Sequence, residues 1–142
     1  MTKISFVEHI SLGTLKKMEQ GLEEYELSHD IHVDYTPFAF ELHSEDGDLI
    51  GVLDAFSSYS SIHIRDLWID KIYRGRGYGK QLIHALEQHF QGKGFNNINT
   101  VSCTFQAPDF YKKCGFQVEF VRENIGNPKL TVTGFVKFFD TQ

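Results

Sequence analysis

The sequence predicts one α/β (α+β) domain over residues 1–142, with a mixed, largely antiparallel sheet of about six to seven strands and helices on both faces. The length suits one core, because two independent cores of this total size would each be marginal. Alternating apolar residues around an Asp-Gly turn predict antiparallel hairpins in the first half of the chain. An amphipathic helix between two strands in the second half predicts a crossover connection.

In the first half, period-2 and helical patterns predict strands over residues 3–7, 35–43, 49–56 and 62–70 and a helix over residues 12–28. Asp46-Gly47 lies between the second and third of these strands, where glycine supplies the positive φ that a tight hairpin turn needs. The strands over residues 35–43, 49–56 and 62–70 are therefore expected to form an antiparallel meander.

In the second half, the same patterns predict helices over residues 77–91 and 107–113 and strands over residues 97–104, 116–121 and 131–138. The longer helix has one apolar stripe formed by Leu82, Ile83, Leu86 and Phe90. Such a stripe indicates a helix that packs on a sheet.

Composition excludes several classes of protein. Apolar residues make up 41% of the chain and charged residues 23%, which is typical of a globular domain and unlike disordered or collagen-like chains. No apolar run is long enough to span a membrane, and charged residues interrupt the N-terminal segment, which does not resemble a secretory signal. With two cysteines, a disulfide framework is not expected, and we expect a soluble cytoplasmic protein without membrane contacts.

The net charge of −5 is distributed unevenly along the chain. Residues 18–64 contain eleven Asp and Glu and no Lys or Arg, whereas residues 65–142 contain eleven Lys or Arg and seven acids. This division suggests that one half faces a cation and the other an anion, although acidic surface also serves solubility. Because nucleic-acid binders are normally basic overall, no nucleic-acid partner is expected.

A glycine-rich segment, RGRGYGK over residues 74–80, joins the strand over residues 62–70 to the longer helix. Alternating glycines let backbone amides approach a ligand, and the start of a helix carries partial positive charge. Helix starts normally carry acidic or capping residues, but this one carries Arg74, Arg76 and Lys80. The segment therefore indicates a diphosphate site, with a solvated tight turn as the alternative. It lacks the Gly-Lys-Ser/Thr of a Walker A loop, and its spacing differs from that of a dinucleotide fold.

Three segments together resemble the GNAT superfamily of N-acetyltransferases: DLWI over residues 66–69, RGRGYG over residues 74–79 and APDFYKKCGF over residues 107–116. The expected order of elements also agrees with that superfamily. The resemblance implies transfer of the acetyl group of acetyl-CoA to a primary amine. One departure is Thr104, where many members carry Asn three residues before the alanine.

The resemblance implies cofactor contacts for Leu67, Trp68, Ile69, Arg74, Gly75, Arg76, Gly77, Tyr78, Gly79, Lys80, Thr104 and Phe110. Amides of residues 75–80 would cradle the CoA pyrophosphate, and Arg74 would orient this loop. The backbone of residues 67–69 would bind the pantetheine arm and polarise the thioester carbonyl. Without the resemblance, the side chains of Leu67 and Ile69 are expected simply to pack in the core.

The resemblance also implies that Tyr111 donates a proton to the departing CoA thiolate. This is reasonable because a tyrosine stays protonated at neutral pH beside a thiol of lower pKa. Taken alone, a Phe-Tyr pair on a short helix is more often a packing feature.

An acceptor amine must lose a proton before it attacks, and Asp66 is the expected base, acting directly or through water. His63 and His84 are alternatives, because an imidazole titrates near neutral pH. Strand alternation places His63 on the opposite face from Asp66 unless the strand contains a bulge.

No metal is expected: His29 and His32 have helix-like spacing but no third ligand at a suitable spacing. Cys103 and Cys114 are interpreted as small apolar residues rather than nucleophiles. We therefore expect direct transfer in a ternary complex without an acetyl-enzyme.

The acidic block leads to a hypothesis about the acceptor. In relatives the first helical region borders the acceptor entrance, so Glu23, Glu24 and Glu26 are expected to bind the substrate, a small-molecule or peptide amine that carries positive charge. The chain is expected to be a monomer or a homodimer. The alternative function is a non-catalytic CoA-binding or sensor domain with the same fold.

Overall fold

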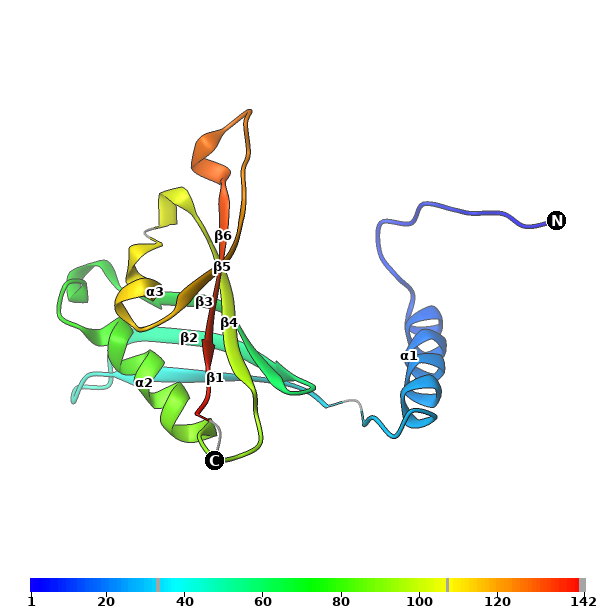
Figure 1. Cartoon of the computed structure of the whole chain (residues 1–142), viewed down its shortest axis with the longest axis horizontal. Coiled ribbons are helices and arrows are strands. Elements are labelled where there is room, and N and C mark those ends of the chain that lie inside the picture. The colour runs from blue at the N-terminus through cyan, green and yellow to red at the C-terminus, as the bar shows by residue number, and fades with distance from the viewer. Residues whose placement is uncertain (33, 107, 141–142) are drawn as a thin grey trace. The chain divides into compact units, whose positions relative to one another are not determined.

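The structure, a computed structural model, describes residues 1–32, 34–106 and 108–140 (Figure 1). The chain divides into two compact units, Met1–Asp34 and Tyr35–Gln142. Among the described residues, no helix is long and apolar enough to cross a membrane.

The first unit contains the helix α1 (Leu12–Leu27), which confirms the helix predicted over residues 12–28. The side chain of Ser11 caps the helix by accepting a hydrogen bond from the Thr14 amide at 3.2 Å. The prediction of a strand over residues 3–7 is wrong. Among the described residues, no strand pairs with this segment, and its apolar side chains are exposed, so its backbone lacks the ladder that a strand requires.

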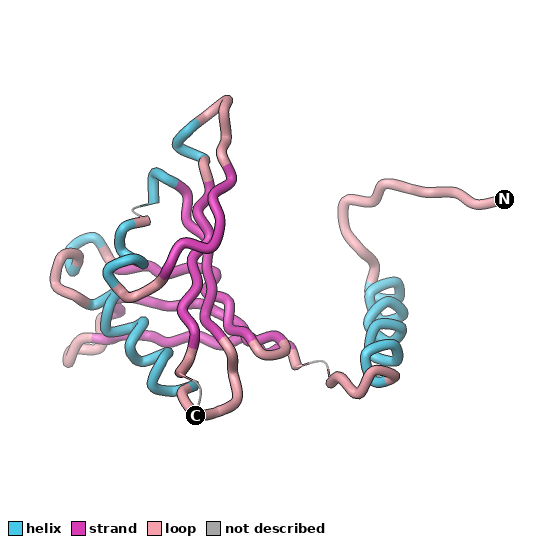
Figure 2. The backbone as a smooth tube through the Cα atoms, in the orientation of Figure 1, coloured by secondary structure: helices cyan, strands magenta, loops and turns pink. Residues whose placement is uncertain are grey.

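The second unit is built on one six-stranded sheet with the order β1-β2-β3-β4-β6-β5 (Figure 2). Its strands are β1 (Tyr35–His43), β2 (Leu49–Ser58), β3 (Ser61–Ile69), β4 (Asn97–Cys103), β5 (Gln117–Arg122) and β6 (Val132–Phe138). The pairs are antiparallel except for β3 with β4, which is parallel. This confirms the predicted class, a mixed, largely antiparallel α/β sheet.

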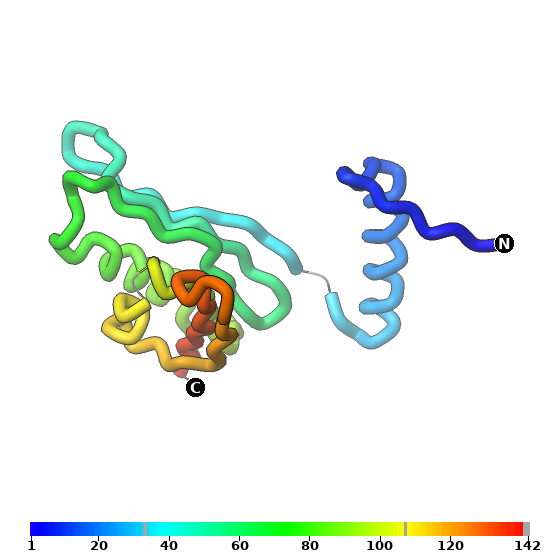
Figure 3. The backbone as a smooth tube through the Cα atoms, turned by 90° about the horizontal axis from the view of Figure 1, so that it is seen from above, coloured from blue at the N-terminus to red at the C-terminus, as the bar shows by residue number. Residues whose placement is uncertain are grey.

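The meander β1–β2–β3 was predicted correctly, and its strands run side by side in Figure 3. At the first turn Gly47 has φ +89°, as the Asp-Gly signal requires. The Ser44 amide donates to the Asp48 carbonyl at 2.8 Å and closes the hairpin.

Two α-helices of this unit, α2 (Tyr78–Phe90) and α3 (Asp109–Lys113), pack on the same face of the sheet. Lys137 of β6 shows the shared face, because its Nζ contacts Glu87 of α2 at 2.9 Å and the Cys114 carbonyl after α3 at 2.8 Å. Short 3-10 turns η1 (Lys71–Tyr73), η2 (Thr104–Gln106) and η3 (Pro128–Leu130) complete the connections. The core on this face includes Leu53, Ile64, Leu82, Leu86 and Phe135.

The parallel pair β3–β4 is short. Its paired residues are only Ser61–His63 of β3, which lie opposite Asn97–Asn99 of β4. One residue further, the Thr100 hydroxyl donates to the Ile64 carbonyl at 3.0 Å. Beyond this bond the two strands have no further paired residues, so in the described part of the chain no strand pairs with the rest of β3 on that side.

The strand β3 contains a β-bulge opposite β2. Asp54 pairs with Asp66 and Ala55 pairs with Ile64, so Arg65 is the extra residue. Since cross-strand partners share a face, the bulge places His63, which pairs with Phe56, on the same face as Asp66. The expectation that simple alternation separates His63 from Asp66 is therefore wrong, and the bulge is the reason.

We predict that Gly51→Ala destabilises the fold by about 1–3 kcal/mol, as overpacking does. A Cβ at Gly51 would lie 2.8 Å from the backbone oxygen of Trp68, where little adjustment is possible. Urea unfolding should show the loss. Gly21→Ala is the control, because a Cβ there meets nothing within 4 Å in α1. Equal stability of the Gly51 variant and the wild type would contradict the prediction.

Candidate active site

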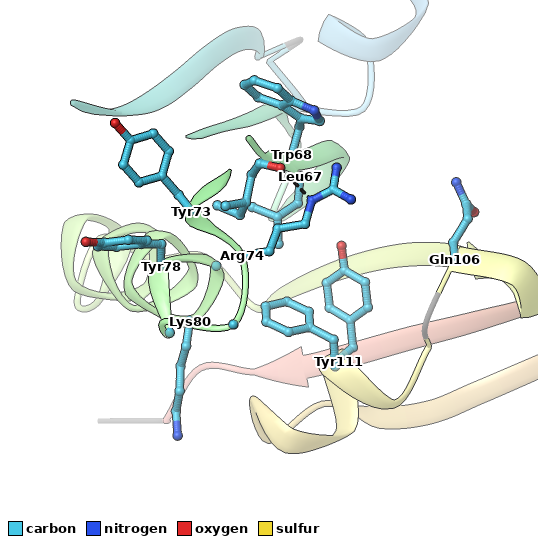
Figure 4. A pocket seen from close by; sticks show the side chains of 13 residues that line it. Leu67, Trp68, Tyr73, Arg74, Tyr78, Lys80, Gln106 and Tyr111 are labelled. Carbon is cyan, nitrogen blue, oxygen red and sulfur yellow. Dashed lines mark hydrogen bonds between the residues drawn. The ribbon is translucent and has the colours of Figure 1, made fainter. Parts of the chain in front are cut away.

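A cavity of about 580 Å³ opens where β3 has left β4 (Figure 4). The end of β3, the loop after it, the start of α2, η2 and α3 supply its walls. The lining residues are Leu67, Trp68, Ile69, Tyr73, Arg74, Gly75, Gly77, Tyr78, Gly79, Lys80, Gln106, Phe110 and Tyr111.

The glycine-rich loop forms one end of this cavity with exposed backbone. Gly75 and Gly77 have φ of +79° and +81°, and a Cβ on either would meet no protein atom within 4 Å. Gly77 is the N-cap of α2, so no side chain caps this helix, and its first turn contains no acidic residue. The first amides of α2 therefore remain available to an anion.

Cations surround the same helix start. The Nε of Arg74 donates to the Ile69 carbonyl at 2.9 Å, which ties the loop to the end of β3. The Arg76 guanidinium lies 5.9 Å from the centre of the Tyr73 ring, and Lys80 is exposed. In the part of the chain that the structure describes, none of these three cations forms an ion pair with a carboxylate. Unpaired cations at the positive end of a helix fit a bound diphosphate.

Tyr111 projects from α3 with its ring packed between Phe116 and Phe135, at centroid distances of 5.5 and 5.6 Å. Figure 4 shows its hydroxyl directed toward the segment that carries Trp68 and Arg74. Burial raises the pKa of Tyr111 above its ordinary value of 10.0. A hydrogen bond with the Thr100 side chain lowers this pKa, and the charges of Cys114 and Asp66 raise it further. The hydroxyl is therefore a proton donor across the neutral range.

Asp66 lies on β3 at the bulge, directly opposite Asp54 of β2. Among the described residues neither carboxylate forms an ion pair with a cation. Like charges that face each other across two strands repel. The pair is thus a concentration of negative charge, and the charge of Asp66 raises the pKa of Tyr111.

The structure brings most of the predicted site residues together. Ten of the twelve predicted cofactor residues line the cavity, and so does Tyr111. Arg76 and Thr104 do not line it; the Thr104 hydroxyl donates to the Thr131 carbonyl at 3.3 Å instead. Asp66 is not among the lining residues and acts on Tyr111 through its charge.

The predicted substrate residues Glu23, Glu24 and Glu26 lie on α1 in the first unit. Their role in binding an acceptor stays a prediction.

Sequence reasoning missed two lining residues, Tyr73 and Gln106. Gln106 lies in η2, and its side-chain oxygen accepts a hydrogen bond from the Cys103 amide at 2.8 Å, which leaves its NH₂ group to face other partners. An amide side chain shortly after a strand, at the end of η2, was the available signal. The next residue, Ala107, begins the predicted short helix and lies outside the described residues.

The cysteines are both free, and Cys114 is buried against the core. Burial raises the pKa of its thiol, and the charges of Lys80 and Lys137 lower it while that of Glu87 raises it. A raised pKa disfavours the thiolate and so a nucleophilic role. Within the described ranges, no group of three His, Cys, Asp or Glu side chains could hold a metal ion.

Comparison with known proteins finds partial sequence relatives, among them an N-acetyltransferase and an acetyltransferase. The chain is 37% identical over 54 residues to glucosamine 6-phosphate N-acetyltransferase 1 of Oryza sativa subsp. japonica, covering 38% of this chain and 32% of that protein. It is 32% identical over 75 residues to blasticidin-S acetyltransferase of Streptomyces morookaense, covering 52% and 55%. The chain thus spans about a third and about half of these relatives.

A solved structure and a family pattern cover more of the chain. An acetyltransferase from Bacillus cereus ATCC 14579 superimposes with a TM-score of 0.76 at 27% identity, covering 95% of this chain and 98% of that one. The sequence pattern described as "Acetyltransferase (GNAT) family" matches residues 7–116. With this match and the cavity between the separated strands, the chain belongs to the GNAT family of acetyltransferases.

Proposed function

We propose that this chain, as a single N-acetyltransferase domain over residues 1–142, transfers the acetyl group of acetyl-CoA directly to a primary amine that carries positive charge. The observation that carries the proposal is the cavity itself. An uncapped, glycine-rich helix start with unpaired cations forms one end, and a protonated Tyr111 stands at the other. This arrangement fits a long, anionic cosubstrate whose reactive group lies next to Tyr111.

The residues that would hold acetyl-CoA follow from the two ends of the cavity. The amides of the loop from Gly75 to Lys80 and the charge of Arg76 suit the diphosphate. At Leu67–Ile69 the side of β3 away from β2 has no strand partner in β4; there the Ile69 carbonyl accepts from Arg74, and the remaining backbone groups are open to an amide-containing arm. A backbone N–H there can also polarise a thioester carbonyl as negative charge develops on it.

Tyr111 would act on the leaving group. Acetyl-CoA supplies an activated acyl group, and the sulfur that leaves gains negative charge as the amine nitrogen forms its bond to the carbonyl carbon. Tyr111 can donate a proton to that sulfur, because a hydroxyl whose pKa is raised remains protonated at neutral pH. Transfer in a ternary complex needs no covalent nucleophile from the chain.

The facing pair Asp54 and Asp66 supports a cationic acceptor. Both lie on the sheet face opposite to α2, and Asp66 is near enough to Tyr111 to affect its pKa. Their mutual repulsion would decrease when an ammonium group lies between or above them. An acceptor with a phosphate would instead increase it.

Thiol release from acetyl-CoA tests the proposal. The acceptors are spermidine, kanamycin, blasticidin S, lysine and glucosamine 6-phosphate, with a blank that lacks any amine. We expect release that depends on an acceptor and is fastest with a polycationic amine. Tight binding of CoA without release for any amine, including a basic peptide, would instead support a sensor domain.

The glycine loop predicts a specific loss of affinity. Gly77→Val should weaken CoA binding at least tenfold, about 1.4 kcal/mol, because its Cβ enters the ligand space and its φ becomes strained. Calorimetric titration with CoA measures the effect. Gly47→Val is the matched control, since Gly47 has a similar φ of +89° and equally open surroundings outside the cavity. An equal loss in both variants would remove the loop from the proposed site.

Tyr111→Phe should reduce turnover by about 10²-fold or more while the packing on Phe116 and Phe135 keeps the stability nearly unchanged. Because burial raises the pKa of Tyr111, wild-type turnover should not lose this proton below about pH 10. Tyr25→Phe removes a hydroxyl from α1, at a position that does not line the cavity, and serves as the control. Normal single-turnover rates in the Tyr111 variant would leave only a packing role.

The charge of the acceptor can be tested through salt. The KM for spermidine should rise between low salt and about 0.15 M, where the Debye length is near 8 Å. Asp54→Asn should raise it about two- to fivefold, equivalent to about 0.5–1 kcal/mol for an exposed pair. Glu23→Gln tests whether α1 contributes in the same way, and Glu119→Gln of β5 is the control. A KM that ignores salt, or a preference for glucosamine 6-phosphate, would contradict a cationic acceptor.

A further inference from the structure

We infer that His63, rather than Asp66, is the base that removes the proton from the acceptor amine; this inference rests on the proposed function. The bulge at Arg65 brings His63 to the face that carries Asp54 and Asp66. His63 is also the last residue of β3 that pairs with β4, so its ring lies where the two strands begin to separate.

A chain of side-chain amides at the start of β4 leads to the ring of His63. The NH₂ group of Asn97 donates to the Asn96 oxygen at 2.9 Å, and that of Asn99 donates to the Asn97 oxygen at 2.9 Å. The oxygen of Asn99 therefore faces His63 Nδ1, at 2.7 Å. With the amides in this orientation, Nδ1 donates to that oxygen, and the lone pair of the neutral ring lies on Nε2.

Packing holds this ring in place. The centre of the His63 ring lies 5.3 Å from that of Phe56, its cross-strand partner, and the two rings are tilted by 44°. The Arg65 guanidinium lies 5.0 Å from the centre of the Phe56 ring. Arg65 also donates to the Tyr35 hydroxyl. This half-buried imidazole has one oriented nitrogen, and no hydrogen bond to its Nε2 occurs among the described residues, which is the arrangement that a general base needs.

The place of His63 in the sheet separates it from the acid. Thr100, which bonds both to Ile64 and to Tyr111, directly follows Asn99 in β4. His63 and Asn99 face one side of the sheet, and Ile64 and Thr100 face the other. A base on the acceptor side and an acid on the side of the leaving thiolate suit a reaction in the gap between the strands. The amine proton moves to Nε2 as the N–C bond forms, and the Tyr111 proton moves to sulfur as the C–S bond breaks.

Asp66 then has a different role. It lies opposite another carboxylate, which suits it to hold the charge of the acceptor. Among the described residues, the charged or titratable groups of β1, β2 and β3 that share the face of His63 include Tyr35, Glu41, Asp54, Arg65 and Asp66. On the same face β4 presents the amides Asn97 and Asn99 and the thiol of Cys103.

The test follows kcat against pH at saturating acetyl-CoA and saturating amine, using the panel amine that gives the fastest thiol release. The wild type should lose activity at low pH as a base becomes protonated. His63→Gln should lower kcat at pH 7 by about 10²-fold or more. It should also remove the fall of kcat at low pH, which is the acidic limb of the pH profile. Asp66→Asn should raise the KM for the amine and keep the limb. His84→Gln, on an exposed position of α2, is the matched control and should change neither.

Two further variants separate catalysis from a structural role. Asn99→Asp should move the acidic limb to higher pH, because a carboxylate at Nδ1 stabilises the imidazolium, and misfolding would not produce such a shift. Added imidazole should restore part of the turnover of His63→Ala but none to Tyr111→Phe.

The outcomes distinguish two failures. A wild type that acetylates no amine overturns the proposed function. An active wild type whose acidic limb survives in His63→Gln, or disappears in Asp66→Asn, overturns only the assignment of the base.

Discussion

The early end of hydrogen bonding between β3 and β4 is the constraint on which the rest of the structure depends. The ladder stops after His63 and Asn99, and a single bond from Thr100 to Ile64 marks the point of separation. Because the two strands diverge there, the end of β3 keeps unpaired backbone groups, and a cavity forms between it and α3. In an ordinary parallel pair, those groups would be consumed by the sheet, and no ligand could reach Tyr111.

Local features of the site could be predicted from the sequence because their physics is local. Glycines that need positive φ, cations at a helix start and an Asp-Gly turn each depend on a few neighbouring residues. The boundaries of α1, α2 and the meander also followed from periodicity, which depends on the side of an element that is buried. Tyr111 was identified because a second motif lies at a fixed place after the loop.

Features that depend on pairing between distant segments could not be predicted. The bulge at Arg65 exists only in the register of β3 with β2, and it reversed the expected face of His63. The amide chain that ends on His63 depends on β4 lying beside β3. The strand expected over residues 3–7 failed for the opposite reason: the alternation was present, but a strand also needs a neighbour to receive its hydrogen bonds. Gln106 lines the cavity from the 3-10 turn η2, and such a turn has no periodic pattern of apolar residues from which its position could be predicted.

The uncapped start of α2 has a consequence for the folded chain as a whole. Arg74, Arg76 and Lys80 repel one another and the positive helix end, and in the described structure no acidic side chain compensates them. A ligand that binds only the folded form adds its binding energy to the free energy of unfolding, about 2.7 kcal/mol when it is present at a hundred times its Kd. A polyanion bound at this loop would therefore supply the negative charge that no acidic side chain of the described structure supplies to these cations. The resistance of this domain to heat and to proteolysis would then follow the supply of coenzyme around it.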